Sequence, residues 1–225
     1  MPSQRLPHAF ILRTVTLHQE VHGVEELTLH TNAGDMPARF HAAGPYASVV
    51  LWVGGAGGGL DGPAWGMYPR LAAQLQLHGI ASMRLHYRFP NDLEACVYDV
   101  LMAVQYLVQQ RALGRVALVG HSFGGAVVIS AGAVADEVTA VVAMSSQTYG
   151  TNLAPRLSPK PLLLLHGTDD EVLPPACSEN IFARSGEPKQ LLLYPGCRHG
   201  LDECRDQVDE DVAAWLTHHL MQPST

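Results

Sequence analysis

At 225 residues, with 47% apolar and 16% charged side chains, the chain has the composition of a folded globular protein and not of a disordered one. A formal net charge of -7, without any run of lysine and arginine, argues against nucleic-acid binding. No apolar stretch reaches the roughly 18 residues that a membrane span needs, so we expect no membrane partner.

The first fifty residues predict an antiparallel beginning to the fold. Residues 24–31 and 36–44 are extended stretches of mixed polarity, and the turn signal NAGD lies between them. We therefore expect a hairpin that adds antiparallel strands to one edge of a sheet.

From residue 47 onward, short apolar runs alternate with longer helical patterns. Strands are expected at 47–55, 80–88, 115–120, 138–146, 160–167 and 189–196. Helices are expected at 68–79, 93–114, 124–135, 176–186 and 204–220, with Asn91 or Asp92 capping the second. This alternation predicts an α/β fold with a doubly wound, mostly parallel sheet. Because no linker or repeat interrupts the pattern, we expect one domain over residues 1–225.

The stretch VALVGHSFGGAVV, residues 116–128, places Ser122 between an apolar strand and a small-residue helix. Its centre fits G-x-S-x-G, the nucleophile elbow, in which a strained turn presents the serine at the end of a strand. The alternative is a tight structural turn that happens to contain a serine. The position favours the elbow, since ligands gather at the carboxyl ends of parallel strands.

A serine hydroxyl becomes a good nucleophile only when a base takes its proton and an acid orients that base. The strand at 160–167 is followed by the adjacent aspartates Asp169 and Asp170, and the last strand is followed by His199. The chain order Ser, Asp, His is the one expected for this kind of sheet. For the two aspartates, the alternative is a capped turn before two prolines. For His199, the alternative is an ordinary loop histidine.

These motifs resemble the α/β-hydrolase superfamily over about residues 25–220, and most closely its small lidless esterases related to dienelactone hydrolases. The segment HGTDDEVLP, residues 166–174, is similar to the H-G-x-x-D-x-x-V-P segment of that group. The resemblance implies that Asp170 is the orienting acid, with Asp169 in reserve, and that Ser122 and His199 are nucleophile and base.

The same resemblance implies an oxyanion hole made of the backbone N–H groups of Ala56 and Phe123. The segment WVGGAGGGLDG departs from the usual H-G pair of the family, because Gly54 stands where the histidine would be. Family enzymes of the dienelactone hydrolase type place cysteine at the elbow, so Ser122 argues against that specific activity. No cofactor and no metal are expected.

The sequence gives fewer indications of the substrate than of the three catalytic candidates. The segment between the strands at 138–146 and 160–167 is too short for a helical cap, which favours small esters in an open pocket. Four residues follow predicted strand ends and are candidates for substrate binding: Trp65, Tyr87, Arg88 and Tyr149. Arg88 is also a candidate for holding a carboxylate or phosphate. The alternative for the three aromatic residues is an ordinary place on the surface or in the core. The alternative for Arg88 is a packed turn with a surface ion pair.

The four cysteines have no CxxC spacing and are predicted to be free thiols of a reducing cytosol. A bridge between Cys197 and Cys204, which flank His199, is the alternative. The first ten residues lack an apolar segment, so we expect no signal peptide and a cytoplasmic protein.

The predicted function is therefore hydrolysis of small carboxylic esters through an acyl-enzyme on Ser122. Thioester or amide cleavage on the same triad remains open at this stage. So does a different class, a small-ligand binding protein on the hydrolase fold with little turnover.

Overall fold

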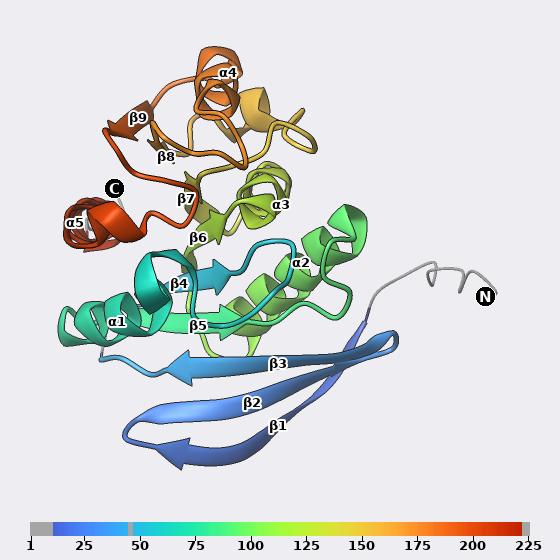
Figure 1. Cartoon of the computed structure of the whole chain (residues 1–225). Helices are drawn as coiled ribbons and strands as arrows, with labels where there is room; N and C mark the ends of the chain where they lie inside the picture. Colours follow the sequence, from blue (N-terminus) through green and yellow to red (C-terminus); the bar gives the residue numbers. More distant parts are fainter. Residues whose placement is uncertain (1–10, 45–46, 222–225) are drawn as a thin grey trace.

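The computed structural model describes residues 11–44 and 47–221, which build a nine-stranded sheet flanked by helices (Figure 1). The strands are β1 (Leu12–Val21), β2 (Val24–Thr31), β3 (Gly34–His41), β4 (Ser48–Val53), β5 (Ala81–Leu85), β6 (Arg115–His121), β7 (Val138–Met144), β8 (Leu162–Gly167) and β9 (Lys189–Tyr194). The helices are α1 (Pro63–Leu77), α2 (Leu93–Gln109), α3 (Phe123–Gly132), α4 (Ala176–Arg184) and α5 (Arg205–Met221). The first ten residues, for which we expect no signal peptide, lie outside the described ones.

The strand order across the sheet is β1-β2-β3-β5-β4-β6-β7-β8-β9. The strands β4 to β9 run parallel, whereas β1, β2 and β3 are antiparallel to their neighbours. This confirms the predicted mostly parallel sheet with an antiparallel edge. The hairpin predicted around NAGD joins β2 to β3, with Thr31 opposite Gly34. The strand β1, which the sequence analysis did not place, extends that edge by one strand.

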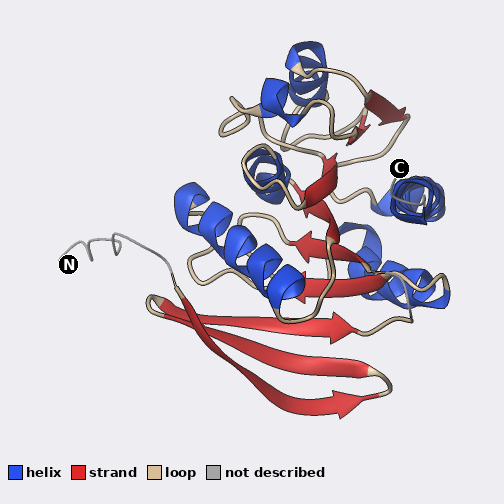
Figure 2. Cartoon of the chain, turned by 180° about the vertical axis from the view of Figure 1, so that it is seen from behind, coloured by secondary structure: helices blue, strands red, loops and turns tan. Residues whose placement is uncertain are grey.

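Helices cover both faces of the sheet, as Figures 1 and 2 show from opposite sides. Buried side chains of α1 and α5 form one apolar cluster, and those of α2, α3 and α4 form the other. The strand β4 supplies both clusters in alternation: Val49 and Leu51 belong to one, Val50 and Trp52 to the other. An uninterrupted apolar run is therefore the correct pattern for a strand buried on two faces.

Two helix boundaries carry information about the site. The carboxylate of Asp92 accepts the backbone N–H of Ala95 at 3.0 Å, so Asp92 and not Asn91 caps α2. The first helix begins at Pro63, earlier than the predicted residue 68, and its residues Ala64, Trp65 and Gly66 have left-handed backbone angles. This irregular turn follows the glycine-rich loop after β4.

No cap covers the sheet among the described residues, as the short connections predicted. The segment between β7 and β8 contains only one short 3₁₀ turn, Ala154–Leu157. Among residues 11–44 and 47–221, no helix combines the length and the apolar character that a membrane crossing requires.

Candidate active site

Three side chains from three strand ends meet at the carboxyl edge of the sheet. Ser122 follows β6, Asp170 follows β8, and His199 follows β9. The Nδ1 of His199 lies 2.7 Å from Oδ2 of Asp170, and its Nε2 lies 3.0 Å from Oγ of Ser122. Because a carboxylate only accepts, Nδ1 carries the hydrogen and Nε2 is left to accept the Ser122 hydroxyl. The structure thus brings together all three residues that the sequence nominated.

Ser122 occupies a strained turn between β6 and α3, with φ 58° and ψ -119°. Its backbone N–H donates to the carbonyl of Met144 in the neighbouring strand at 2.8 Å, which anchors the turn to the sheet. The glycines two residues away make this turn sterically allowed. A Cβ on Gly120 would overlap the carbonyl oxygen of Gly124, and one on Gly124 would overlap that of Gly54. The G-x-S-x-G pattern is therefore a packing requirement at this site.

Replacing Gly124 by alanine is expected to lower the free energy of unfolding by about 3 kcal/mol. The new methyl group meets rigid backbone of the neighbouring loop, which has no side-chain rotamer through which to yield. Thermal and urea unfolding measure the change. The matched control is Gly114→Ala, because a Cβ at Gly114 meets nothing within 4 Å. Equal stability of the two variants would contradict the packing account of the elbow.

Asp170 is buried, and both its carboxylate oxygens have donors. Its Oδ1 accepts the backbone N–H groups of Val172 and Leu173, each at 2.8 Å, while Oδ2 faces His199. Burial alone would raise its pKa, but hydrogen bonds from Leu173, His199 and Val172 outweigh it, so the pKa of Asp170 lies below its ordinary value. The carboxylate is therefore ionised at neutral pH. Asp169 is exposed and accepts the Thr168 hydroxyl, so geometry decides between the two aspartates in favour of Asp170.

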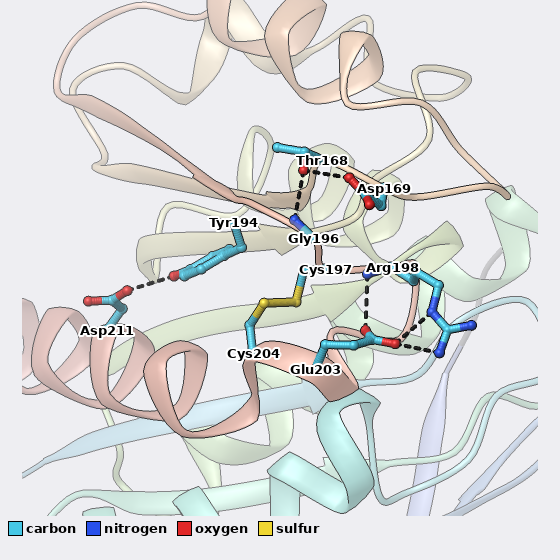
Figure 3. The surroundings of a disulfide bond; sticks show 9 residues. All are labelled: Thr168, Asp169, Tyr194, Gly196, Cys197, Arg198, Glu203, Cys204 and Asp211. Carbon is cyan, nitrogen blue, oxygen red and sulfur yellow. Dashed lines mark hydrogen bonds and ion pairs between the residues drawn. A yellow bond between two sulfur atoms is a disulfide. The ribbon is translucent and has the colours of Figure 1, made fainter.

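The loop that carries His199 is closed by a disulfide bond between Cys197 and Cys204, seven residues apart (Figure 3). The prediction of four free thiols is therefore wrong for this pair and holds for Cys96 and Cys177. A 3₁₀ turn at Asp202–Cys204 folds the chain back and brings the two Cα atoms to 5.9 Å, within the range of disulfides. The cysteines consequently no longer support the predicted reducing compartment.

His121, the second residue of GHSFG, contacts the same loop and was not singled out from the sequence. Its Nε2 lies 2.9 Å from the carbonyl oxygen of His199, so this nitrogen carries the hydrogen and donates it. The two imidazole rings lie 4.9 Å apart between centroids. Burial lowers the pKa of His121 to about 4, so the ring is neutral at neutral pH. Through this hydrogen bond, His121 attaches the backbone of His199 to β6, the strand that leads into Ser122.

His121 predicts a pH dependence of stability. Its folded pKa of about 4 lies below the ordinary 6.5, so the unfolded chain takes up the proton first. The contribution of the neutral His121 to stability is therefore fully present above pH 6.5 and is lost as the pH falls toward about 4. The variant His121→Gln keeps an N–H donor and cannot ionise. Urea unfolding at pH 7.5 and 4.5 should show a drop that is smaller in the variant by about 2 kcal/mol.

His41 is the internal reference for that comparison. Burial lowers its pKa to about 4 as well, ahead of the nearby charges of Arg84 and Arg39. It remains in both proteins, so both should lose some stability in acid. Identical losses in the wild type and in His121→Gln would contradict the assignment of a buried neutral His121.

The two backbone amides expected to form an oxyanion hole belong to the residue after Ser122 and to the residue after Gly55, whose turn packs against Ser122. Phe123 is the first residue of α3, so its N–H has no partner within the helix. Ala56 lies at the tip of a tight turn in which the N–H of Gly58 donates to the carbonyl of Gly55 at 2.9 Å. A Cβ placed on Gly55 would lie 3.5 Å from Cβ of Ser122, so this turn packs against the serine. Among the described residues, neither the Ala56 nor the Phe123 N–H donates to a backbone carbonyl of a turn or loop.

Two of the four candidate substrate residues are exposed at this edge of the molecule. Trp65 is 75% exposed and Tyr149 is 77% exposed. The backbone N–H of Trp65 donates to the carboxylate of Asp202 at 3.0 Å, and that of Ala64 donates to the carbonyl of Gly200 at 2.7 Å. The left-handed turn of α1 is thereby attached to the loop that follows His199, which places Trp65 next to that loop.

The other two candidates are structural, and the prediction that they bind substrate is corrected. Tyr87 is buried, donates its hydroxyl to the carbonyl of Gly54 at 3.2 Å and packs edge-on against Phe123. The Arg88 guanidinium is 1% exposed and pairs with the fully buried carboxylate of Asp99. Arg88 is thus inaccessible to a substrate carboxylate or phosphate, and its ion pair lies in the core and not on the surface.

The fold has close parallels among solved structures. A dienelactone hydrolase from Anabaena variabilis ATCC 29413 superposes with a TM-score of 0.76 at 18% identity, over 88% of this chain and 100% of that one. Est1E from Butyrivibrio proteoclasticus superposes with a TM-score of 0.74 at 17% identity, over 88% of this chain and 99% of that one. At such identities the likeness concerns the fold alone. The architecture is that of an α/β hydrolase.

A family model narrows this class. The model described as the dienelactone hydrolase family matches residues 69–221, and the chain belongs to that family. The resemblance stated from the sequence is thereby confirmed for the family and for the α/β-hydrolase fold.

Similarity to curated proteins is confined to short segments. The uncharacterized protein YfhR of Escherichia coli (strain K12) is 44% identical over 50 residues, which are 22% of this chain and 18% of that protein. A monoglyceride lipase of Saccharomyces cerevisiae (strain ATCC 204508 / S288c) is 35% identical over 66 residues, 27% of this chain and 21% of that protein. The matches therefore span only about a fifth of these relatives.

Proposed function

We propose that this hydrolase cleaves small carboxylic esters through an acyl-enzyme on Ser122. The observation that supports the proposal most strongly is the continuous hydrogen-bonded chain from Ser122 through His199 to the ionised Asp170. Each side chain comes from a different strand end, and the contacts order them as a serine hydroxyl, an imidazole and a carboxylate, as nucleophilic catalysis needs.

The roles follow from the geometry. The Ser122 oxygen attacks the acyl carbonyl while Nε2 of His199 takes the hydroxyl proton, and the same nitrogen returns the proton to the leaving alcohol. Water then repeats the cycle on the acyl-enzyme, with His199 again as the base. Asp170 keeps the hydrogen on Nδ1 and stabilises the imidazolium that forms in each step.

Stabilisation of the tetrahedral oxyanion is assigned to the backbone N–H groups of Ala56 and Phe123. Both flank Ser122, and each such donor contributes about 3 kcal/mol to transition-state binding. The position of Phe123 at the first residue of α3 adds the positive end of the helix dipole.

The size of the substrate is inferred from what surrounds the site. No cap is present among the described residues, and two exposed aromatic side chains, Trp65 in the first turn of α1 and Tyr149 after β7, are candidates for the substrate surface. Such a site gives short or protruding acyl groups access and offers a long acyl chain little shelter. Esterase structures and a monoglyceride lipase among the similar proteins agree with ester chemistry in general.

A panel of p-nitrophenyl esters of increasing acyl length, beside the matching thioesters, tests the proposal. We expect many turnovers per enzyme, a kcat/KM that falls as the acyl chain lengthens, and a preference for the oxygen ester. A preference for thioesters would reassign the leaving group on the same triad. Acylation or binding without turnover would favour the ligand-binding class, and no reaction with any member would contradict the proposal.

A further inference from the structure

The carboxylate of Asp170 contacts a second histidine that the proposed reaction does not use. His166 lies at the end of β8 and is fully buried. Its Nε2 lies 3.1 Å from Oδ2 of Asp170, the same oxygen that faces His199. The same Nε2 lies 2.9 Å from the carbonyl oxygen of Leu173. Two imidazoles, one from β8 and one from the loop after β9, therefore approach the same carboxylate oxygen.

The contacts determine which nitrogen of His166 carries hydrogen. A carbonyl oxygen and a carboxylate can only accept, so Nε2 is a donor whatever the charge of the ring. The other nitrogen, Nδ1, lies 2.7 Å from Oγ of Ser178, which is also fully buried and belongs to α4. Ser178 thus fixes the orientation of the His166 ring through Nδ1. The Nε2–H on the opposite side of the ring points to the Leu173 carbonyl, in the loop that carries Asp170.

Leu173 connects the two ends of this arrangement. Its backbone N–H donates to Oδ1 of Asp170 at 2.8 Å, while its carbonyl accepts the hydrogen of His166. One residue therefore joins His166 and Asp170 through its own peptide groups. Moving His166 would disturb the carboxylate through Leu173 as well as through the direct contact at Oδ2.

We propose that His166 is a positioning residue, which with Ser178 holds the Asp170 carboxylate in place through Leu173 and through the contact at Oδ2. The inference rests on the proposed function, since it assigns a supporting role for the same triad. His166 touches neither the nucleophile nor the substrate, so it acts through Asp170 alone. This role would explain why a histidine stands at the first position of the HGTDDEVLP segment.

The charged and titratable groups around this carboxylate are few and come from separate elements. His166 is on β8, His199 is on the loop after β9, and His121 is on β6. His121 is neutral near pH 7 because burial lowers its pKa to about 4. The exposed Asp169 points its carboxylate at Thr168. Among the described residues, His166 and His199 are thus the imidazoles that contact Oδ2 of Asp170, while the N–H groups of Val172 and Leu173 bond to Oδ1.

The test compares His166→Leu with His166→Gln on an ester that the wild type turns over. Leucine removes the N–H, whereas the amide nitrogen of glutamine restores a donor at the position of Nε2. We expect His166→Leu to lower kcat about tenfold with little change in KM, and His166→Gln to recover most of that loss. Without the Nε2–H contact at Oδ2, we expect the carboxylate to favour protonated His199 more strongly. The acid limb of kcat/KM should therefore move to higher pH by roughly half a unit.

A merely structural role would lower the rate at every pH and leave the acid limb in place. Ser178→Ala, which keeps His166 but removes its anchor, should move the limb in the same direction by less, and it serves if His166→Leu does not fold. An unchanged kcat and acid limb in the folded variants would overturn the inference while wild-type turnover stood. Failure of the wild type itself to turn over any ester would instead remove the proposed function.

Discussion

Replacing Ser122 by alanine is expected to lower kcat for an activated ester about 10⁶-fold. The hydroxyl is the atom that forms the acyl-enzyme, and its described hydrogen bond to His199 is the contact that alanine removes. Stability should change little, because the turn is held by the backbone N–H of Ser122 and by the flanking glycines. Pre-steady-state and steady-state kinetics on a p-nitrophenyl ester measure the loss.

The residual rate of Ser122→Ala is informative as well. About 10³-fold catalysis over water should persist, because the oxyanion donors and the bound geometry remain. Thermal unfolding is the control for the fold. A folded variant with a wild-type rate would contradict Ser122 as the nucleophile, whichever substrate is used.

Replacing Asp170 by asparagine is expected to lower kcat about 10⁴-fold. The carboxylate accepts from three N–H groups, those of His199, Val172 and Leu173, and an amide in its place must direct its own NH₂ group at one of them. His199 would then lose the acceptor that keeps the hydrogen on Nδ1. Its Nε2 would no longer be free to take the Ser122 proton.

The adjacent aspartate provides the matched control for this variant. Asp169→Asn changes the same functional group one residue earlier, on an exposed side chain that bonds to Thr168. Its rate should stay within about twofold of the wild type. A large loss in Asp169→Asn together with a small one in Asp170→Asn would reverse the assignment of the acid.

Much of this site could be predicted because its residues lie at strand ends. A parallel sheet brings the carboxyl ends of its strands to one edge, so apolar runs followed by Ser122, Asp170 and His199 were enough to nominate the three. The same runs predicted the fold, since strands such as β4 are buried on both faces and contain no polar residue in their centre.

The parts that could not be predicted depend on neighbours distant in sequence. Arg88 was nominated for substrate binding because it follows a strand. In the structure its guanidinium instead forms an ion pair with the carboxylate of Asp99, which lies on α2. The strand β1 carries exposed side chains on both faces and so has no clear alternation. The bridge from Cys197 to Cys204 needs the turn at Asp202–Cys204, which spacing alone does not indicate.

The contributions of His121 and His166 were missed for the same reason. Each stands inside a motif that was used for another residue: one precedes Ser122, and the other begins the segment that ends in Asp170 and its prolines. Their partners, the His199 carbonyl and the Asp170 carboxylate, are specified only by the packing of β6, β8 and the last loop. A histidine adjoining a catalytic motif is therefore worth testing as a second support of the triad.

Intact-mass analysis after incubation with a small fluorophosphonate tests the central claim most directly. The account predicts a single covalent adduct on the wild type, lost in Ser122→Ala and strongly slowed in Asp170→Asn. Both variants should be confirmed as folded beforehand. An unlabelled wild type, or an adduct that persists in Ser122→Ala, would contradict an activated serine at position 122.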